Sequence, residues 1–307
     1  FKVLHNHADA SVSKQSRLII GPWGHAKNVF FPDGSSTENF RFVSIARSFD
    51  WFDRHLKGHN GVQTSPVRIF VMGDNRWRDE QTWPLPRAVN TKLFLQSDGN
   101  AADPSGDGQL LLEAPSDTHI PDVFTYNPLN PVPTRGGAFM GPGMAIKQQN
   151  TIELRPDVLS YTSSPLAENV EVTGYVHATL FVSTDAASTD FTAKLVDVYP
   201  DGSAYNIADG ILRQPYDVGD QRVSIVIQLG ATSNVFQKGH RIRLDVSSSN
   251  FPLFDRNPNT GTPIAFETRA VASLQKIHHD ASAPSFVELP IVPVKNAVQL
   301  IRFHADE

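Results

Sequence analysis

Two periodicities of apolar residues divide the chain. In residues 35–58, SSTENFRFVSIARSFDWFDRHLKG, apolar side chains recur every three or four positions, which predicts a helix with one apolar stripe. The stripe comprises Phe42, Ile45, Phe49, Phe52 and Leu56. Ser35 and Glu38 have the spacing of an N-terminal capping box, and Lys57 followed by Gly58 predicts the helix end.

Short strand patterns flank this helix. Arg17–Ile20 reads as a buried strand that Gly21-Pro22 ends. In SPVRIFVMGDNRW, residues 65–77, apolar Val67, Ile69 and Val71 occupy alternate positions, which predicts a second strand. The order strand, loop, helix, strand is the repeating unit of an α/β fold. Residues 1–88 therefore read as the last part of an α/β domain, too small to form a doubly wound sheet alone.

Beyond a proline-containing linker at Trp83–Asn90, the period changes to two. In VTGYVHATLFVSTD, residues 172–185, apolar or small residues alternate with bulkier or polar ones. Pro200-Asp201-Gly202 has the composition of a tight turn between two such segments. Strands at this spacing without intervening helices predict an all-β domain over residues 89–307, a β-sandwich of the jelly-roll kind.

Composition narrows the candidate partners. The formal net charge is −5, and no run of Lys or Arg is present, so nucleic acid and anionic membranes are poor candidates. No apolar stretch approaches the ~18 residues of a membrane span. The chain has no cysteine, which excludes disulfides and thiolate chemistry but leaves the compartment open. We expect a soluble protein, with the cytoplasm favoured. A chain that opens on Phe1 without a signal peptide is expected to be a fragment or a processed piece.

The stretch RLIIGPWGHA, residues 17–26, holds the strongest candidate for chemistry. His25 lies in a loop at the carboxyl end of a buried strand, where α/β sheets keep their active sites. An imidazole there can act as a general base and then a general acid. A histidine that only caps the loop or binds a backbone carbonyl remains the alternative.

Other candidate groups are weaker. A G-x-S-x-G nucleophile elbow does not occur in the sequence. The serines at 35–36 are better explained by helix capping, and those at 247–249 end a strand and lack the glycines. His278-His279-Asp280 is not expected to bind a metal, because adjacent side chains on a strand point to opposite faces. We therefore predict no metal and no cofactor.

Many segments together resemble one enzyme family. They include LIIGPWGH, WFDRHLKG, VRIFVMGDNRWRDEQTWPLP, LFLQSDGN, NPLNPVPTRGG, STDFTAKLVDVYPDG, ATSNVFQKGHRIRLDVSSSNFPLFDRNPNTG and PSFVELPIV. These motifs, in this order from about Arg17 to the end, resemble the cocaine esterase and X-prolyl dipeptidyl aminopeptidase family of serine hydrolases. That family also includes α-amino acid ester hydrolases and cephalosporin acylases. The resemblance implies an α/β-hydrolase domain with a helical cap, followed by a jelly-roll domain of the galactose-binding-like kind. It places this chain at the C-terminal part.

The resemblance also assigns candidate residues. It implies that His25 is the histidine of a Ser-Asp-His triad, whose serine and aspartate are not in this chain. Trp23 beside it, and Phe139 and Met140 in RGGAFMG, are the candidate substrate-pocket residues. The implied substrates are small esters or amides, including X-Pro dipeptidyl bonds. The alternative function is a non-catalytic jelly-roll module that binds, for example, carbohydrate.

The expected absence of the N-terminal half predicts an exposed apolar surface and therefore a partner. The apolar surface of residues 1–88 needs covering, because large bare apolar patches are unusual on soluble monomers. Phe30, Phe31, Phe49 and Trp51 are the predicted bare side chains. We therefore expect association with the missing N-terminal half, or self-association.

Overall fold

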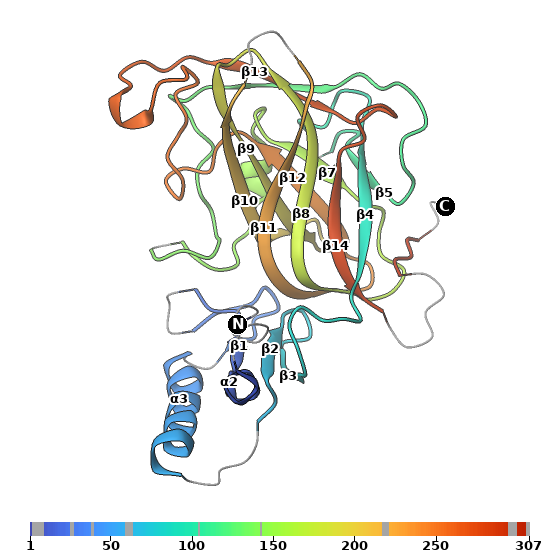
Figure 1. Ribbon diagram of the computed structural model, residues 1–307. Helices are drawn as coiled ribbons and strands as arrows, with labels where there is room; N and C mark the ends of the chain where they lie inside the picture. Colours follow the sequence, from blue (N-terminus) through green and yellow to red (C-terminus); the bar gives the residue numbers. More distant parts are fainter. Residues whose placement is uncertain are drawn as a thin grey trace.

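The computed structural model describes residues 1, 9–24, 28–37, 40–58, 64–103, 105–141, 143–216, 221–293 and 300–304, with the backbone only for residues 10 and 40–44. Within them a small α/β unit lies at one end of a much larger β structure (Figure 1). His25, Glu38 and Phe42 lie outside the described residues or side chains. Among the described helices, none combines the length and apolarity that crossing a membrane requires.

The small unit contains two helices and a three-stranded sheet. Its elements are α2 (Ala10–Gln15), β1 (Leu18–Ile20), α3 (Phe40–Lys57), β2 (Val67–Val71) and β3 (Arg76–Glu80). β1 pairs in parallel with β2, and β3 pairs antiparallel on the other side of β2. A parallel pair joined through a helix is the α/β unit that the sequence predicts. The predicted strand is confirmed as β2, in which Val67, Ile69 and Val71 are fully buried, but Phe70 on the other face is buried as well.

The predicted C-terminal end of the helix is confirmed, but the predicted N-terminal cap is wrong. Gly58 has φ of +67°, which favours glycine, and it follows the last helical residue, Lys57, as predicted. The capping role of Ser35 is wrong, because the helix begins at Phe40. The Ser35 hydroxyl instead donates to the Asp33 carboxylate at 2.6 Å, inside a turn that precedes the helix. Short-range bonding to a nearby carboxylate competes with capping.

The remaining strands form one large mixed sheet. They are β4 (Val89–Gln96), β5 (Gln109–Leu111), β6 (Asp122–Tyr126), β7 (Leu159–Thr162), β8 (Val170–Thr184), β9 (Ser188–Val198), β10 (Ala204–Pro215), β11 (Val223–Phe236), β12 (Arg241–Ser247), β13 (Ser273–His278) and β14 (Phe286–Val292). Two short helical segments, α4 (Asn150–Glu153) and η1 (Ile264–Phe266), interrupt them. The strand order is β10-β9-β12-β7-β5-β4-β14-β8-β13-β6, and β11 pairs with β8. The predicted all-β character of this part is confirmed.

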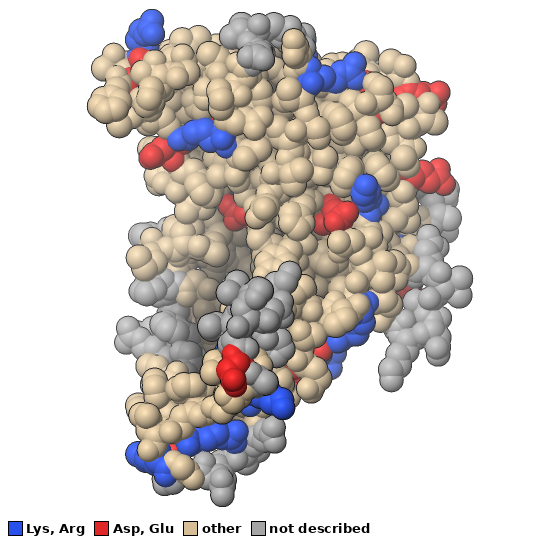
Figure 2. Space-filling view, viewed as in Figure 1, with Lys and Arg blue, Asp and Glu red and all other residues tan. Residues whose placement is uncertain are grey.

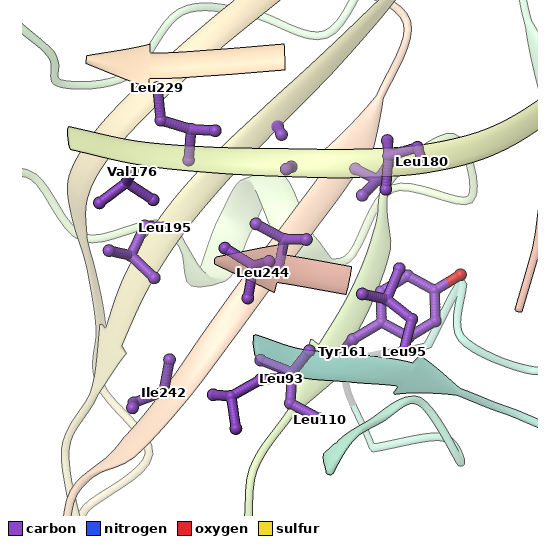
Figure 3. Close-up of a cluster of buried hydrophobic side chains, with 14 of the residues drawn as sticks. Leu93, Leu95, Leu110, Tyr161, Val176, Leu180, Leu195, Leu229, Ile242 and Leu244 are labelled. Carbon is purple, nitrogen blue, oxygen red and sulfur yellow. The ribbon is translucent and has the colours of Figure 1, made fainter. Parts of the chain in front are cut away.

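This sheet folds back on itself around one apolar core. Leu180 of β8 and Leu244 of β12 belong to the same buried cluster, and Figure 3 shows side chains from both strands pointing into the shared space. The period-two pattern produces this core, since Val172, Val176 and Val182 of β8 are all fully buried. The predicted turn joins β9 to β10, where Gly202 has φ of +85°.

The small sheet docks on the ends of β8 and β11. The Met72 amide donates to the Ser233 carbonyl at 3.0 Å, and the Val235 amide donates to the Met72 carbonyl at 2.8 Å. The Arg78 guanidinium donates to both carboxylate oxygens of Glu171 at 2.6 and 2.7 Å. Trp83, in the predicted linker, is buried in the apolar cluster at this junction. These contacts fix the small sheet relative to the large one.

Candidate functional site

The loop that follows β1 carries the predicted catalytic histidine. Its described part is Gly21–Gly24, so the position of His25 itself lies outside the described residues. The Trp23 indole folds back over the backbone of Gly21, where a β-carbon would overlap the ring. The same indole packs on Trp77 of β3, with ring centroids 5.5 Å apart. Trp23 therefore holds this loop against the small sheet.

An aromatic cluster supports Trp23. Phe31 stacks on Phe70 with a centroid distance of 5.7 Å, and Phe70 meets Trp77 edge-on at 5.3 Å. The prediction that Phe31 is bare is wrong, because this stacking buries it to 7% exposure. Phe30 points the other way and is 70% exposed, as predicted.

The second predicted part of the site is the glycine-rich loop between Arg135 and Gln149. Met140 is 74% exposed. Phe139 is half-buried, and its ring folds over Gly141 of the same loop. Ala145 and Ile146, later in this loop, pack against the aromatic cluster that holds Trp23.

Met144 joins this loop to the histidine loop, and sequence reasoning missed it. A β-carbon placed on Gly24 would lie 2.8 Å from the Met144 sulfur, so the thioether rests directly on the backbone of the residue before His25. The signal in the sequence is weak: a methionine among four glycines, in a loop otherwise read for Phe139 and Met140. The structure thus brings the two predicted site segments together through a residue that neither prediction named.

A cavity of about 250 Å³ lies between the small unit and the large sheet. Residues of both units line it, including Phe31, Asp33, Met72, Tyr199, Tyr205 and His240. The His240 imidazole nitrogen Nδ1 lies 2.9 Å from Asp197 Oδ1, and Tyr199 packs on the imidazole with a centroid distance of 4.2 Å. Burial raises the pKa of Asp197, although His240 and Asn234 act in the opposite direction. Sequence reasoning missed this pair because Asp197 lies on β9 and His240 lies 43 positions later, just before β12.

His278 and His279 bind separate partners, as expected from their alternation. His278 Nε2 lies 2.9 Å from the Ser183 hydroxyl, and His279 Nε2 lies 3.0 Å from Asp122 Oδ2. Asp280 accepts hydrogen bonds from Ser282. Among the described residues, no three His, Cys, Asp or Glu side chains converge as metal ligands would.

Comparison with known proteins gives the chain a family. Residues 60–288 match the model of the X-Pro dipeptidyl-peptidase C-terminal non-catalytic domain. The chain is 40% identical to cocaine esterase from Rhodococcus sp. (strain MB1 Bresler), over 95% of this chain and 53% of that protein.

Two solved structures share the fold over most of the chain. One is an aminopeptidase from the marine-sediment archaeon Thaumarchaeota archaeon, with TM-score 0.76 and 26% identity over 91% of this chain and 49% of its own. The other is an α-amino acid ester hydrolase, with TM-score 0.74 and 25% identity over 90% of this chain and 50% of its own.

The chain spans about half the length of these relatives. The segment that the family model covers includes the second half of the small unit and the large β structure as far as the start of β14. The family expected from the sequence motifs is confirmed. The chain belongs to the X-Pro dipeptidyl-peptidase C-terminal domain family and is a homologue of cocaine esterase.

Proposed function

We propose that this chain is the C-terminal part of a serine hydrolase that cleaves esters or amides, including X-Pro dipeptidyl bonds, through an acyl-enzyme. In this proposal residues 1–88 are the C-terminal part of an α/β-hydrolase domain. Residues 89–307 are a jelly-roll domain of the galactose-binding-like kind. The observation that carries the proposal is the loop after β1: it follows the first strand of a parallel pair and rests against Met144, in a chain similar to an esterase over nearly its whole length.

His25 is the group through which this chain would enter the chemistry. A serine from the other half of the protein would attack the substrate carbonyl, and His25 would take its proton and pass it to the leaving group. An aspartate from that half would hold the imidazole in the correct tautomer. Backbone N–H groups of the same half would donate hydrogen bonds to the oxyanion. The contribution of this chain is to hold the histidine loop in place through Trp23 and Met144.

Trp23, Phe139 and Met140 are proposed to line the acyl pocket. Trp23 lies two residues from His25 and is fixed by Trp77. Phe139 and Met140 lie on the loop whose Met144 touches Gly24, which supports a place for both near the histidine loop. The exposure of Met140 leaves its side chain available to a substrate or to the other half of the protein.

The proposed partner is the catalytic half, and helix α3 supports that proposal. Its described apolar side chains are bare: Phe49 is 65% and Leu56 is 78% exposed. Trp51 is 40% exposed, although its indole nitrogen donates to the Gln15 carbonyl. Basic side chains on this helix pair with acidic ones, as Lys57 does with Asp53 at 2.7 Å, and Figure 2 shows both signs of charge at this end of the molecule. An α/β-hydrolase core would cover this face; self-association is the alternative.

The experiment measures esterase activity of the protein expressed from the natural reading frame that encodes these residues. This protein, with wild-type His25, should hydrolyse p-nitrophenyl esters, and His25→Ala should lower kcat by a factor on the order of 10³ or more. His304→Ala, which changes an exposed histidine, is the matched control. The purified 307-residue chain should show no turnover, because it supplies neither nucleophile nor orienting acid. Turnover by the isolated chain that His25→Ala abolishes would overturn the proposal.

A second candidate function is binding of a small polar ligand, such as a carbohydrate, by the large β part. The cavity of about 250 Å³ favours it, since two tyrosines, a histidine and Asp33 converge there. Clefts with apolar walls and few polar groups, set between two units, are common ligand sites. A panel of monosaccharides tested by saturation-transfer NMR should give signals that Tyr205→Ala removes. No transfer to any sugar would eliminate this candidate.

A further inference from the structure

The loop between Arg135 and Gln149 is tied at its base by one buried amide. Gln149 is fully buried. Its Nε2 donates to the carbonyls of Arg135 at 2.9 Å and Lys147 at 2.8 Å. These two carbonyls belong to opposite legs of the loop, so a single side chain joins both legs.

Asn206 of β10 makes the second tie. Its Oδ1 accepts from the Lys147 amide at 2.7 Å, and its Nδ2 donates to the Ala145 carbonyl at 3.3 Å. A β-carbon on Gly136 would overlap Oδ1, so the Gly136 backbone lies directly against Asn206. Gln149 Nε2 also lies 3.2 Å from Asn206 Oδ1, which links the two ties.

The loop itself holds a conformation that needs such ties. Gly137 and Ala145 exchange two backbone hydrogen bonds of 2.9 Å. Ala145 has φ of +69°, the left-handed region, which costs an alanine about 1–2 kcal/mol. A strained residue persists only where its surroundings determine it, and here the Asn206 amide holds its carbonyl.

Lys194 of β9 binds the side-chain carbonyl of Gln149. Its Nζ donates to Gln149 Oε1 at 2.8 Å. Burial lowers the pKa of Lys194, while Asp245, Asp209 and Glu153 act to keep it charged. Gln149 therefore has both its donors and its acceptor committed, and turning away would remove the hydrogen bond that its Oε1 accepts from Lys194.

From this network we infer that Gln149, anchored by Lys194 and joined to Asn206, is a positioning residue that fixes the loop 135–149 and so sets acyl-group specificity. The inference rests on the proposed function, in which Phe139 and Met140 line the acyl pocket. Neither Gln149 nor Lys194 touches the substrate. They act by holding Phe139, Met140 and Met144 beside the histidine loop.

Hydrogen exchange of the 307-residue chain tests the positioning role without any activity. In the wild type, the amides of Gly137 and Ala145 should exchange slowly, as amides of β10 do. Gln149→Leu should speed their exchange by about tenfold or more relative to β8, since it removes every hydrogen bond that the Gln149 side chain makes to the two legs of the loop. Gln148→Leu, an exposed neighbour, is the matched control and should change neither amide.

Three exchange outcomes would overturn the inference. They are free exchange of these amides in the wild type, unchanged exchange in Gln149→Leu, and equal acceleration over the whole domain. Should Gln149→Leu fail to fold, Asn206→Ala serves as the second variant with the same expectation. The wild-type measurement decides even if neither variant folds.

Ester hydrolysis by the protein that the natural reading frame encodes tests the specificity role. Gln149→Leu should change the ratio of kcat/KM for p-nitrophenyl acetate over p-nitrophenyl butyrate by about threefold or more, and Gln148→Leu should not. An unchanged ratio would overturn the specificity role. An absence of hydrolysis by the wild-type protein would overturn the proposed function instead, and the exchange result would still decide the positioning role.

Discussion

The Met144 thioether lies on the backbone of Gly24, so close that a β-carbon on this glycine would lie 2.8 Å from the sulfur and 3.1 Å from the adjacent carbon. The two residues come from opposite sides of the domain boundary that we propose. Gly24 follows a strand of the small α/β unit, and Met144 belongs to a loop on the large sheet. Their contact leaves room for a β-carbon at this position only if Met144 moves.

Gly24→Ala should therefore act through Met144. We expect it to destabilise the chain by about 1 kcal/mol, because methionine is flexible and can move partly aside. In a Met144→Ala background the same substitution should be nearly neutral, giving a coupling of about 0.5–1 kcal/mol in a double-mutant cycle measured by urea unfolding. Equal costs in both backgrounds would contradict the contact.

Much of the fold follows from periodicity. The alternation in β8 predicts which side chains enter the core, and Val172, Val176 and Val182 are all buried. The Lys57-Gly58 signal predicts the end of α3. These features depend on neighbours two to four positions away, which a sequence displays directly.

The features that sequence reasoning missed depend on distant neighbours. Besides its short-range bond to Asp33, the Ser35 hydroxyl accepts a hydrogen bond from Asn75, 40 residues away, which no local pattern shows. Phe31 is buried by Phe70, on another strand. Gln149 and Lys194 lie 45 positions apart and meet only after the sheet folds. No local pattern marks a buried glutamine as the tie of a loop.

The bare face of α3 should govern self-association. We expect the 307-residue chain to bind the dye ANS and to self-associate in light scattering, because Phe49 and Leu56 are largely exposed. The double variant Phe49→Ser, Leu56→Ser should reduce both signals by about half or more. Its melting temperature should stay close to wild type, since these side chains are not buried.

The control for this surface is Val226→Ser, at a 52% exposed apolar position on β11. It should leave dye binding and light scattering unchanged. A wild-type chain that is a clean monomer without dye binding would contradict the expectation for α3.

Asp122 holds a buried hydrogen-bond network in the large sheet. Its carboxylate accepts from Ser97, the Ala101 amide, Tyr161 and His279, all within 2.8–3.0 Å. Burial by itself would raise the pKa of Asp122, but the hydrogen bonds from His279, Ala101 and Tyr161 lower it below its ordinary value. The carboxylate therefore stabilises the fold above its unfolded pKa, and this stability is lost as the pH falls through the lowered value.

Asp122→Asn should cost about 3 kcal/mol at pH 7, because the amide nitrogen would face hydrogen-bond donors. It should also flatten the loss of stability below pH 4. Urea unfolding at pH 7 and pH 3 measures both. Asp98→Asn is the control, since the Asp98 side chain is 88% exposed. A cost at pH 7 no larger than that of the control would argue against the network.

Glu153 should make the chain less stable as the pH rises. Burial, together with nearby Asp245, raises the pKa of Glu153 to about 8, although Arg243 donates to its carboxylate at 2.7 Å. Burial is the larger cause and the charge of Asp245 adds to it, while Arg243 and Lys194 act in the opposite direction. The folded state therefore holds a proton that the unfolded state releases near pH 4.5.

This bound proton decides the direction in which stability changes with pH. Stability from Glu153 is complete below pH 4.5 and falls as the pH rises toward 8, by about 1 kcal/mol per unit. Glu153→Gln mimics the protonated acid and should flatten this fall, so that the variant gains on the wild type between pH 5 and pH 8. Unfolding free energies from urea titrations across that range measure the slope. Glu113→Gln, at an exposed position, should keep the wild-type slope. A Glu153→Gln curve parallel to wild type would show that the buried proton lies elsewhere in the cluster.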